Sequence, residues 1–140
     1  MKIPVVVVDD QEVDRYLVKR RLQKNQNFGD LIELSGGEKL LQKYFSEDPV
    51  GADVEPLLVL MDINMPGMDG FETIEEIQRR MSEGKGPDSI VVMMITSSGN
   101  LKDQERAEKL SVVKGFISKP LDEQGVQYIL DLYTGYVSRD

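Results

Sequence analysis

Five residues whose side chains could do chemistry share one position in this 140-residue sequence, because each follows a strongly apolar run. They are Asp9, Asp10, Asp62, Thr96 and Lys119. If the apolar runs are strands of one parallel sheet, their carboxyl ends lie along the same edge, where open α/β proteins bind their ligands. The sequence therefore predicts that three carboxylates, a hydroxyl and an ammonium group meet in a single site.

Three carboxylates in one place repel one another unless a counter-charge is present. A divalent cation supplies that charge, and the chain contains neither His nor Cys, the usual nitrogen and sulfur ligands. Oxygen ligands favour Mg²⁺, with Mn²⁺ as the alternative. A hydroxyl and an ammonium group are suited to hold phosphate oxygens, so the set is typical of phosphoryl transfer. Without His or Cys, the candidate acceptor is a carboxylate, which would become an aspartyl phosphate.

The elements that must position these residues alternate along the chain. Apolar runs predict buried strands at residues 5–8, 31–34, 57–61, 90–95 and 116–117. Apolar residues at helical spacing predict helices at about 13–21, 38–45, 71–81, 101–110 and 126–133, with Asp122 as the expected N-cap of the last helix. The repeated strand–helix unit indicates an α/β fold, a parallel sheet with helices on both faces. The segment 46–56 contains two prolines and a glycine, which predicts an exposed loop.

Composition excludes several classes of protein. The net charge of −8 argues against a nucleic-acid binder, because such a protein needs a basic face. No apolar run approaches the roughly 20 residues of a membrane-spanning helix. The apolar run near the start is also too short for a signal peptide. We therefore expect a soluble, cytoplasmic protein of one domain.

Four motifs, each at the end of a predicted strand, resemble those of the receiver domain of bacterial two-component response regulators. They are VDD at 8–10, LMDINMPGMDG at 60–70, ITS at 95–97 and FISKP at 116–120. The resemblance covers about residues 3–133. It implies a flavodoxin-like, doubly wound (βα)5 fold with a five-stranded parallel sheet of order 2-1-3-4-5. We expect residues 1–140 to form a single receiver domain with no output domain, either as a stand-alone receiver that acts by binding or as a fragment of a larger regulator.

The resemblance implies a role for each matching residue. Asp62 would accept a phosphoryl group from a phosphohistidine donor. Asp9, Asp10, Asp62 and the backbone carbonyl of Asn64 would bind Mg²⁺, with Mn²⁺ as the alternative ion. Lys119 and Thr96 would hold phosphate oxygens, and Pro120 would follow a cis peptide bond.

The resemblance also places Phe116 at the aromatic switch position of the family. Phosphorylation would add charge and acceptor oxygens at Asp62, and the Thr96 hydroxyl would follow them inward with the loop 96–100. Phe116 could then turn inward and change the face formed by the fourth helix, the fifth strand and the fifth helix. Such a switch needs a sensor histidine kinase or histidine phosphotransfer protein as donor and a downstream protein as target. Neither nucleic acid nor membrane is expected as a partner, and the chain is expected to be a monomer or weak dimer.

The same residues are compatible with three hypotheses about function. The first is a phosphorylation-controlled binding switch that catalyses only its own phosphorylation and dephosphorylation and is not otherwise an enzyme. The second is an aspartyl-phosphate hydrolase, but such an enzyme needs a second Asp two residues after the nucleophile, where this chain has Asn64. The third is a constitutive binding scaffold, which would not need the complete acidic set. The basic run 19–21 is either a solvated helix face or a docking surface for a kinase.

Overall fold

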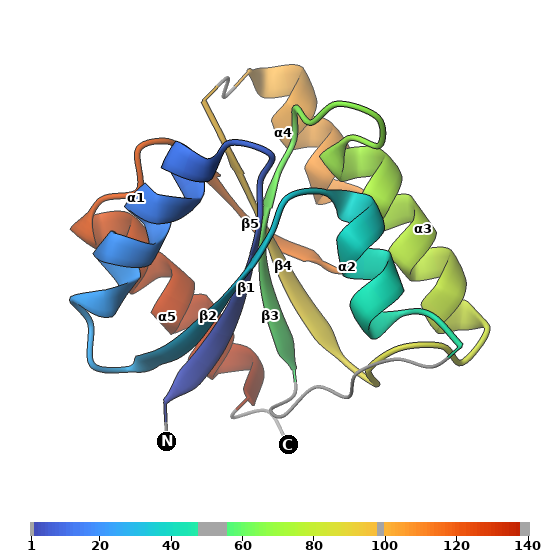
Figure 1. The fold of residues 1–140 in the computed structure, drawn as a ribbon, viewed down its shortest axis with the longest axis horizontal. Coiled ribbons are helices and arrows are strands. Elements are labelled where there is room, and N and C mark those ends of the chain that lie inside the picture. Colours follow the sequence, from blue (N-terminus) through green and yellow to red (C-terminus); the bar gives the residue numbers. More distant parts are fainter. Residues whose placement is uncertain (1, 48–55, 98–99, 138–140) are drawn as a thin grey trace.

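The computed structural model describes residues 2–47, 56–97 and 100–137, and strands and helices alternate through these ranges (Figure 1). The strands are β1 (Ile3–Val8), β2 (Phe28–Leu34), β3 (Leu57–Asp62), β4 (Ile90–Thr96) and β5 (Val113–Ser118). The helices are α1 (Glu12–Gln23), α2 (Gly37–Tyr44), α3 (Gly70–Ser82), α4 (Leu101–Glu108) and α5 (Glu123–Val137). The predicted alternation is confirmed. Among the described helices, none combines the length and the apolar character needed to span a bilayer.

The strands form one parallel sheet of order β2-β1-β3-β4-β5, the order that the resemblance implies. Figure 1 shows α1 and α5 on one side of the sheet and α2, α3 and α4 on the other. The chain therefore leaves β1 toward one face and leaves the neighbouring β3 toward the opposite face. Doubly wound sheets bind their ligands beside the carboxyl ends of the two strands where such a divergence occurs, which here are β1 and β3.

Side chains alternate along the buried strands and so divide the interior into two apolar cores. The core beneath α2, α3 and α4 receives from the central strands Val6, Val8, Val59, Met61, Val92 and Met94. The core beneath α1 and α5 receives from the same strands Val5, Val7, Leu58, Leu60, Val91, Met93 and Ile95. Because helices cover both faces of the sheet, the sequences of these strands are continuous apolar runs.

The edge strands are longer than the sequence predicts. β2 begins at Phe28 instead of residue 31, and β5 spans six residues where only 116–117 were expected. Exposed Asp30 in β2 and half-buried Lys114 in β5 interrupt the apolar pattern from which strands were predicted. The predictions for the segment 46–56 and for the loop 96–100 fall in part on residues 48–55 and 98–99, which lie outside the described residues.

Side-chain caps fix where three of the helices begin. Asp69 caps α3 in a capping box, in which its carboxylate accepts the Glu72 N–H at 2.8 Å and the Glu72 carboxylate accepts the Asp69 N–H at 3.1 Å. Asn100 caps α4 through its side-chain oxygen. At α5, the carboxylate of Asp122 accepts the N–H three residues further on at 2.8 Å, which confirms the predicted N-cap.

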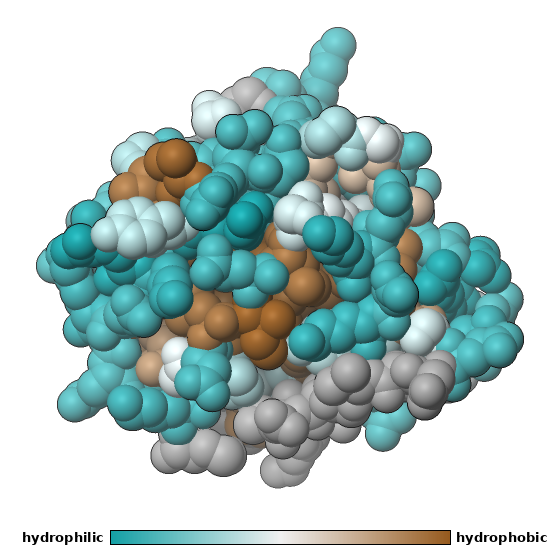
Figure 2. Space-filling model, in the orientation of Figure 1, coloured by the Kyte–Doolittle hydropathy of each residue, from teal (hydrophilic) through white to brown (hydrophobic). Residues whose placement is uncertain are grey.

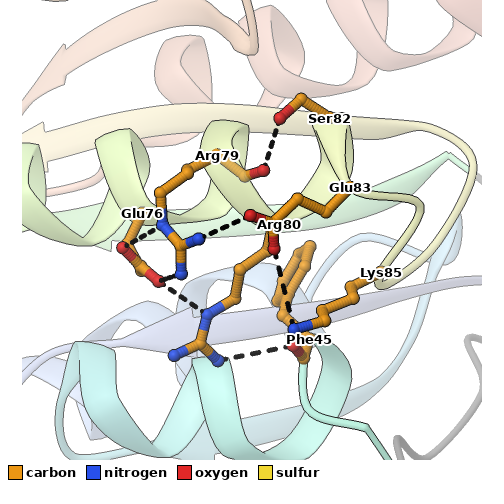
Figure 3. Close-up of polar contacts among 7 residues, drawn as sticks. All are labelled: Phe45, Glu76, Arg79, Arg80, Ser82, Glu83 and Lys85. Atoms are coloured by element: carbon orange, nitrogen blue, oxygen red, sulfur yellow. Dashed lines mark hydrogen bonds and ion pairs between the residues drawn. The ribbon is translucent and has the colours of Figure 1, made fainter.

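A network of charged side chains joins α3 to the end of α2 (Figure 3). Glu76 accepts hydrogen bonds from both Arg79 and Arg80. These bonds lower the pKa of Glu76 to about 2, so it remains ionised at any ordinary pH. Arg80 also donates to the carbonyl oxygen of Phe45, just beyond α2, at 3.3 Å. The network therefore links the two helices at the end of the sheet opposite to the predicted site.

Candidate functional site

The carboxyl edge of the sheet brings the predicted acids together. β1 and β3 pair in parallel with Val8 opposite Met61, so the residues that follow, Asp9 and Asp62, are neighbours across the two strands. Both are buried, whereas Asp10 is half-buried. One carboxylate oxygen from each of these three acids lies within 4.8 Å of the other two. The sheet register thus produces the cluster that the strand-end positions predict.

Lys119, from the loop after β5, provides the positive charge beside these acids. Its Nζ lies 2.7 Å from Asp9 Oδ2 and 3.5 Å from Asp62 Oδ1. The same Nζ lies 3.0 Å from Oδ2 of Asp14, in the first turn of α1. The lysine side chain is only 13% exposed, so these contacts are made largely away from solvent.

Charge at the site is only partly balanced. Burial, together with the charge of Asp9, raises the pKa of Asp62 from 3.8 to about 6, although Lys119 opposes the shift. Burial alone would lower the pKa of Lys119, but hydrogen bonds to Asp9 and Asp14 and the charge of Asp62 outweigh it and raise that pKa. One ammonium group therefore faces more negative charge than it can neutralise.

The chemistry of this donor set fits a hard divalent cation. Asp9, Asp10 and Asp62 offer only carboxylate oxygens, which are the ligands that such ions prefer. The cluster could therefore bind a divalent metal ion. Asn64, whose backbone carbonyl is the fourth predicted ligand, lies two residues after Asp62 and has an exposed side chain.

Asp9 is held by contacts from the start of α1. One of its carboxylate oxygens accepts the backbone N–H of Gln11 at 2.9 Å, and the other accepts the Lys119 ammonium. Arg15 donates to the Asp9 backbone carbonyl at 2.7 Å. These bonds fix the orientation of the carboxylate that is deepest in the cluster.

The turn after Asp62 lies against the end of β3. The N–H of Gly70 donates to the carbonyl of Ile63 at 2.8 Å, so α3 begins in contact with the strand end. A Cβ atom at position 70 would lie 2.3 Å from the backbone oxygen of Asp62. Gly67, earlier in the turn, has a φ of 77°, a conformation that favours glycine. Both glycines therefore help to shape the segment that carries the candidate acceptor.

The other predicted site residues lie at β4 and β5. Thr96 is the buried last residue of β4, and its carbonyl accepts the Lys119 N–H at 2.8 Å. The Lys119–Pro120 peptide bond is cis, as the resemblance implies. Phe116 is half-buried, packs on the core beneath α2, α3 and α4, and lines with Tyr128 a groove of about 250 Å³ between α4 and α5. Phe116 thus lies on the face where the switch was expected.

Asp14, which contacts Lys119, and Arg15, which contacts Asp9, were not predicted from the sequence. They follow Asp10 by four and five residues, so the first turn of α1 returns them to the same edge of the sheet. Asp14 accepts a hydrogen bond from Lys119, which is 105 residues away in the chain, and no local sequence pattern predicts such a pair. The only signal in the sequence was that Asp14 is a further acid a few residues after Asp9 and Asp10, which follow β1.

Comparisons with known proteins point to one family. Residues 5–131 match the family described as the response regulator receiver domain. The chemotaxis protein CheY of Halobacterium salinarum is 31% identical over 122 residues, which cover 87% of this chain and 88% of that protein. The protein PilH of Pseudomonas aeruginosa is 28% identical over 130 residues, covering 86% of this chain and 88% of PilH. The crystal structure of a two-component response regulator from Legionella pneumophila covers 95% of this chain and 99% of its own, with 26% identity and a TM-score of 0.72.

Proposed function

The chain belongs to the response regulator receiver domain family of two-component signalling, and from this premise we propose that Asp62 accepts a phosphoryl group from a phosphohistidine on a partner protein. The observation that carries the proposal is the cluster at the carboxyl edge of the sheet. There Asp62 lies beside two further acids, Asp9 and Asp10, and 3.5 Å from the Lys119 ammonium. The proposed acceptor is thus buried among groups suited to a metal ion and a phosphate.

In the proposed transfer, a carboxylate oxygen of Asp62 attacks the phosphorus of the donor phosphoimidazole. An O–P bond forms as the P–N bond breaks, and the imidazole leaves with the bonding electrons and takes up a proton. Lys119 then contacts a phosphoryl oxygen, since its Nζ already lies close to Asp62. Hydrolysis by water returns the free carboxylate and releases inorganic phosphate, so the chain turns over no separate substrate.

The residues proposed to hold Mg²⁺, or Mn²⁺ in its place, are Asp9, Asp10, Asp62 and, through its backbone carbonyl, Asn64. The bound ion would supply positive charge to the carboxylates and to the phosphoryl oxygens as charge shifts between them. Arg15 and Gln11 contribute indirectly, because they fix Asp9 by bonds to its carbonyl and carboxylate.

We propose that the histidine donor docks over α1, beside the acceptor. Val13, Tyr16 and Leu17 of this helix are between 52% and 68% exposed, and Figure 2 shows an apolar patch at the upper left, where Figure 1 places α1. Such a patch is suited to a protein partner. The first turn of α1 lies beside the site, because its Asp14 contacts Lys119.

The basic run at 19–21 is largely engaged within the chain. Lys19 lies 3.9 Å from Glu33, Arg20 donates to the Tyr16 hydroxyl, and Arg21 donates to a backbone carbonyl after β5. These contacts favour the exposed apolar residues over the basic run as the centre of the docking surface.

The downstream target is proposed to bind the face formed by α4, β5 and α5. Phe116 and Tyr128 border a groove on that face, and a change in the Phe116 side chain would alter its shape. Thr96 ends the neighbouring strand β4 and is the residue through which the phosphoryl group would reach this face.

The test of the proposal is phosphorylation by acetyl phosphate with Mg²⁺, followed by intact-mass spectrometry. The wild-type chain is expected to gain one phosphoryl group, and removal of Mg²⁺ with a chelator is expected to prevent the gain. Asp62→Asn should remain unmodified, whereas Asp30→Asn, an exposed acid on β2, should behave as wild type. Modification of Asp62→Asn to the wild-type extent would refute the assignment.

A further inference from the structure

Lys119 makes one contact that the proposed function does not use. Its Nζ donates to Asp9 at 2.7 Å and to Asp14 at 3.0 Å, whereas Asp62 lies farther away, at 3.5 Å. Asp14 lies on α1 and is not part of the three-acid cluster that could hold a metal ion. The ammonium group is therefore shared between the cluster and a helix that flanks it.

An ammonium group has only three N–H donors. In this structure Asp9 and Asp14 each accept a good hydrogen bond from Lys119, which leaves one donor directed at Asp62 over a longer distance. A phosphoryl group on Asp62 adds several strong acceptor oxygens beside the same ammonium. The phosphoryl oxygens and the Asp14 carboxylate then compete for Lys119.

We propose that Asp14 is a positioning residue, one that holds Lys119 against α1 in the resting state and gives it up when Asp62 carries a phosphoryl group. This inference rests on the proposed function of Asp62. Because the Asp14 carboxylate competes for Lys119 and also repels an incoming anion, it weakens the binding of a phosphoryl group. Asp14 thus sets how readily the loaded state forms.

Space beside the pair allows the exchange. Asp14 and Lys119 line a cavity of about 370 Å³, together with Leu17 of α1 and Pro120 and Leu121 of the loop after β5. The Asp14 side chain is 34% exposed, so water can solvate its carboxylate once Lys119 has moved. The same cavity borders the apolar surface of α1, so the exchange takes place beside the proposed docking surface for the donor.

The first test measures the affinity for beryllofluoride, a mimic of the phosphoryl group, by calorimetry at saturating Mg²⁺. Asp14→Asn is expected to bind beryllofluoride about two- to fivefold more tightly than wild type, the size expected when a partly exposed ion pair no longer competes. Glu12→Gln removes the same charge from the same exposed turn without touching Lys119 and should bind as wild type. Asp14→Glu retains the charge and should bind within twofold of wild type.

A second readout follows the lysine itself, by NMR of the side-chain signals of ¹⁵N- and ¹³C-labelled lysine, with Lys119 assigned through Lys119→Arg. In wild type without added ligand, Asp14→Asn should shift the Lys119 signals, and Glu12→Gln should leave them in place. Addition of beryllofluoride and Mg²⁺ to wild type should also move them. A role of Asp14 in folding alone would move the unfolding midpoint and leave the ratio of the beryllofluoride affinities unchanged.

The outcomes separate the two proposals. If wild type binds no beryllofluoride at saturating Mg²⁺, the proposed function of Asp62 fails, and the inference fails with it. If wild type binds beryllofluoride but Asp14→Asn binds it equally or less tightly, the proposed function stands and the role of Asp14 is overturned.

Discussion

At Asp62 two requirements oppose each other. The carboxylate must be ionised to act as a nucleophile, yet it is buried beside Asp9, and both features raise its pKa to about 6. Lys119 relieves the repulsion only in part, because Asp9 and Asp14 take its shorter hydrogen bonds. The residue proposed to do the chemistry is therefore also one that destabilises the metal-free fold near neutral pH.

This conflict predicts how stability depends on pH. The folded state holds the Asp62 proton with a pKa of about 6 against 3.8 when unfolded. Asp62 therefore favours folding when protonated, below about pH 4, and this stabilisation is lost as the pH rises through 6. By pH 8 the ionised group costs about 3 kcal/mol. Asp62→Asn should thus raise the free energy of urea unfolding at pH 8 without metal by about 2–3 kcal/mol, and the difference should shrink at pH 4.

The matched control for this prediction is Glu12→Gln, which removes an exposed carboxylate near the same edge of the sheet. It should change the unfolding free energy little at either pH. Equal stability of wild type and Asp62→Asn at pH 8 would show that the burial of Asp62 carries no cost.

Individual site residues were predictable where they lie at the end of an apolar run that predicts a strand. Asp9 and Asp62 each stop a continuous apolar run, and pairing of those runs in parallel is enough to bring the two acids together. Asp14 was not predictable, because its partner Lys119 is set by the packing of α1 beside the loop after β5. Such a contact depends on helix position, which the apolar pattern of a half-exposed helix fixes only loosely.

At the scale of elements, the start of α3 and the end of β3 are fitted to each other. Gly70 lies so close to the strand that a Cβ atom there would be 2.3 Å from the Asp62 carbonyl oxygen and 3.0 Å from the Ile63 Cα. Both obstacles are backbone atoms, so a rotamer change in a side chain cannot remove them. A side chain at position 70 must displace either the helix or the loop that carries Asp62.

Gly70→Ala is accordingly expected to destabilise the fold by about 1–3 kcal/mol, the usual cost of overpacking a close contact. It should also weaken Mg²⁺ binding in calorimetry, because the displaced loop carries Asp62. Gly135→Ala is the matched control: a Cβ atom in that part of α5 would meet nothing within 4 Å. This control should raise stability by about 0.5–1 kcal/mol through helix propensity. Unchanged Mg²⁺ affinity in Gly70→Ala would contradict the proposed fit.

Element boundaries show where the sequence was less informative. The central strands β3 and β4 were predicted to within one residue, because helices bury both of their faces and their apolar runs are continuous. The edge strands β2 and β5 were predicted too short, because residues such as Asp30 and Lys114 can face outward while the backbone still pairs with one neighbour. Hydropathy records the exposure of a side chain and not the pairing of its backbone.

At the scale of the whole molecule, the order of the strands matters more to the site than any single contact. β1 and β3 lie side by side although α1, β2 and α2 separate them in the chain, and α1 and α3 leave them toward opposite faces (Figure 1). The apolar cores on the two sides of the sheet hold these strands in register. The acidic cluster is consequently preformed in the folded chain and absent from the unfolded one, so a metal ion that binds it must stabilise the fold.

This linkage yields a prediction for the whole chain. At pH 7.5 and a Mg²⁺ concentration of about ten times its dissociation constant, the free energy of unfolding should rise by about 1.4 kcal/mol. In a thermal scan the midpoint should rise by about 5 °C. NaCl at matched ionic strength should not reproduce the rise, because screening acts on all exposed charges and does not require the cluster. Without metal, Asp62→Asn should unfold at a higher temperature than wild type. Because this variant lacks one metal ligand, the same Mg²⁺ concentration should raise its unfolding midpoint several-fold less. The difference in midpoint between the two chains should therefore become smaller when Mg²⁺ is added. Equal stabilisation of both chains by Mg²⁺ would place the bound ion elsewhere than between Asp9, Asp10 and Asp62.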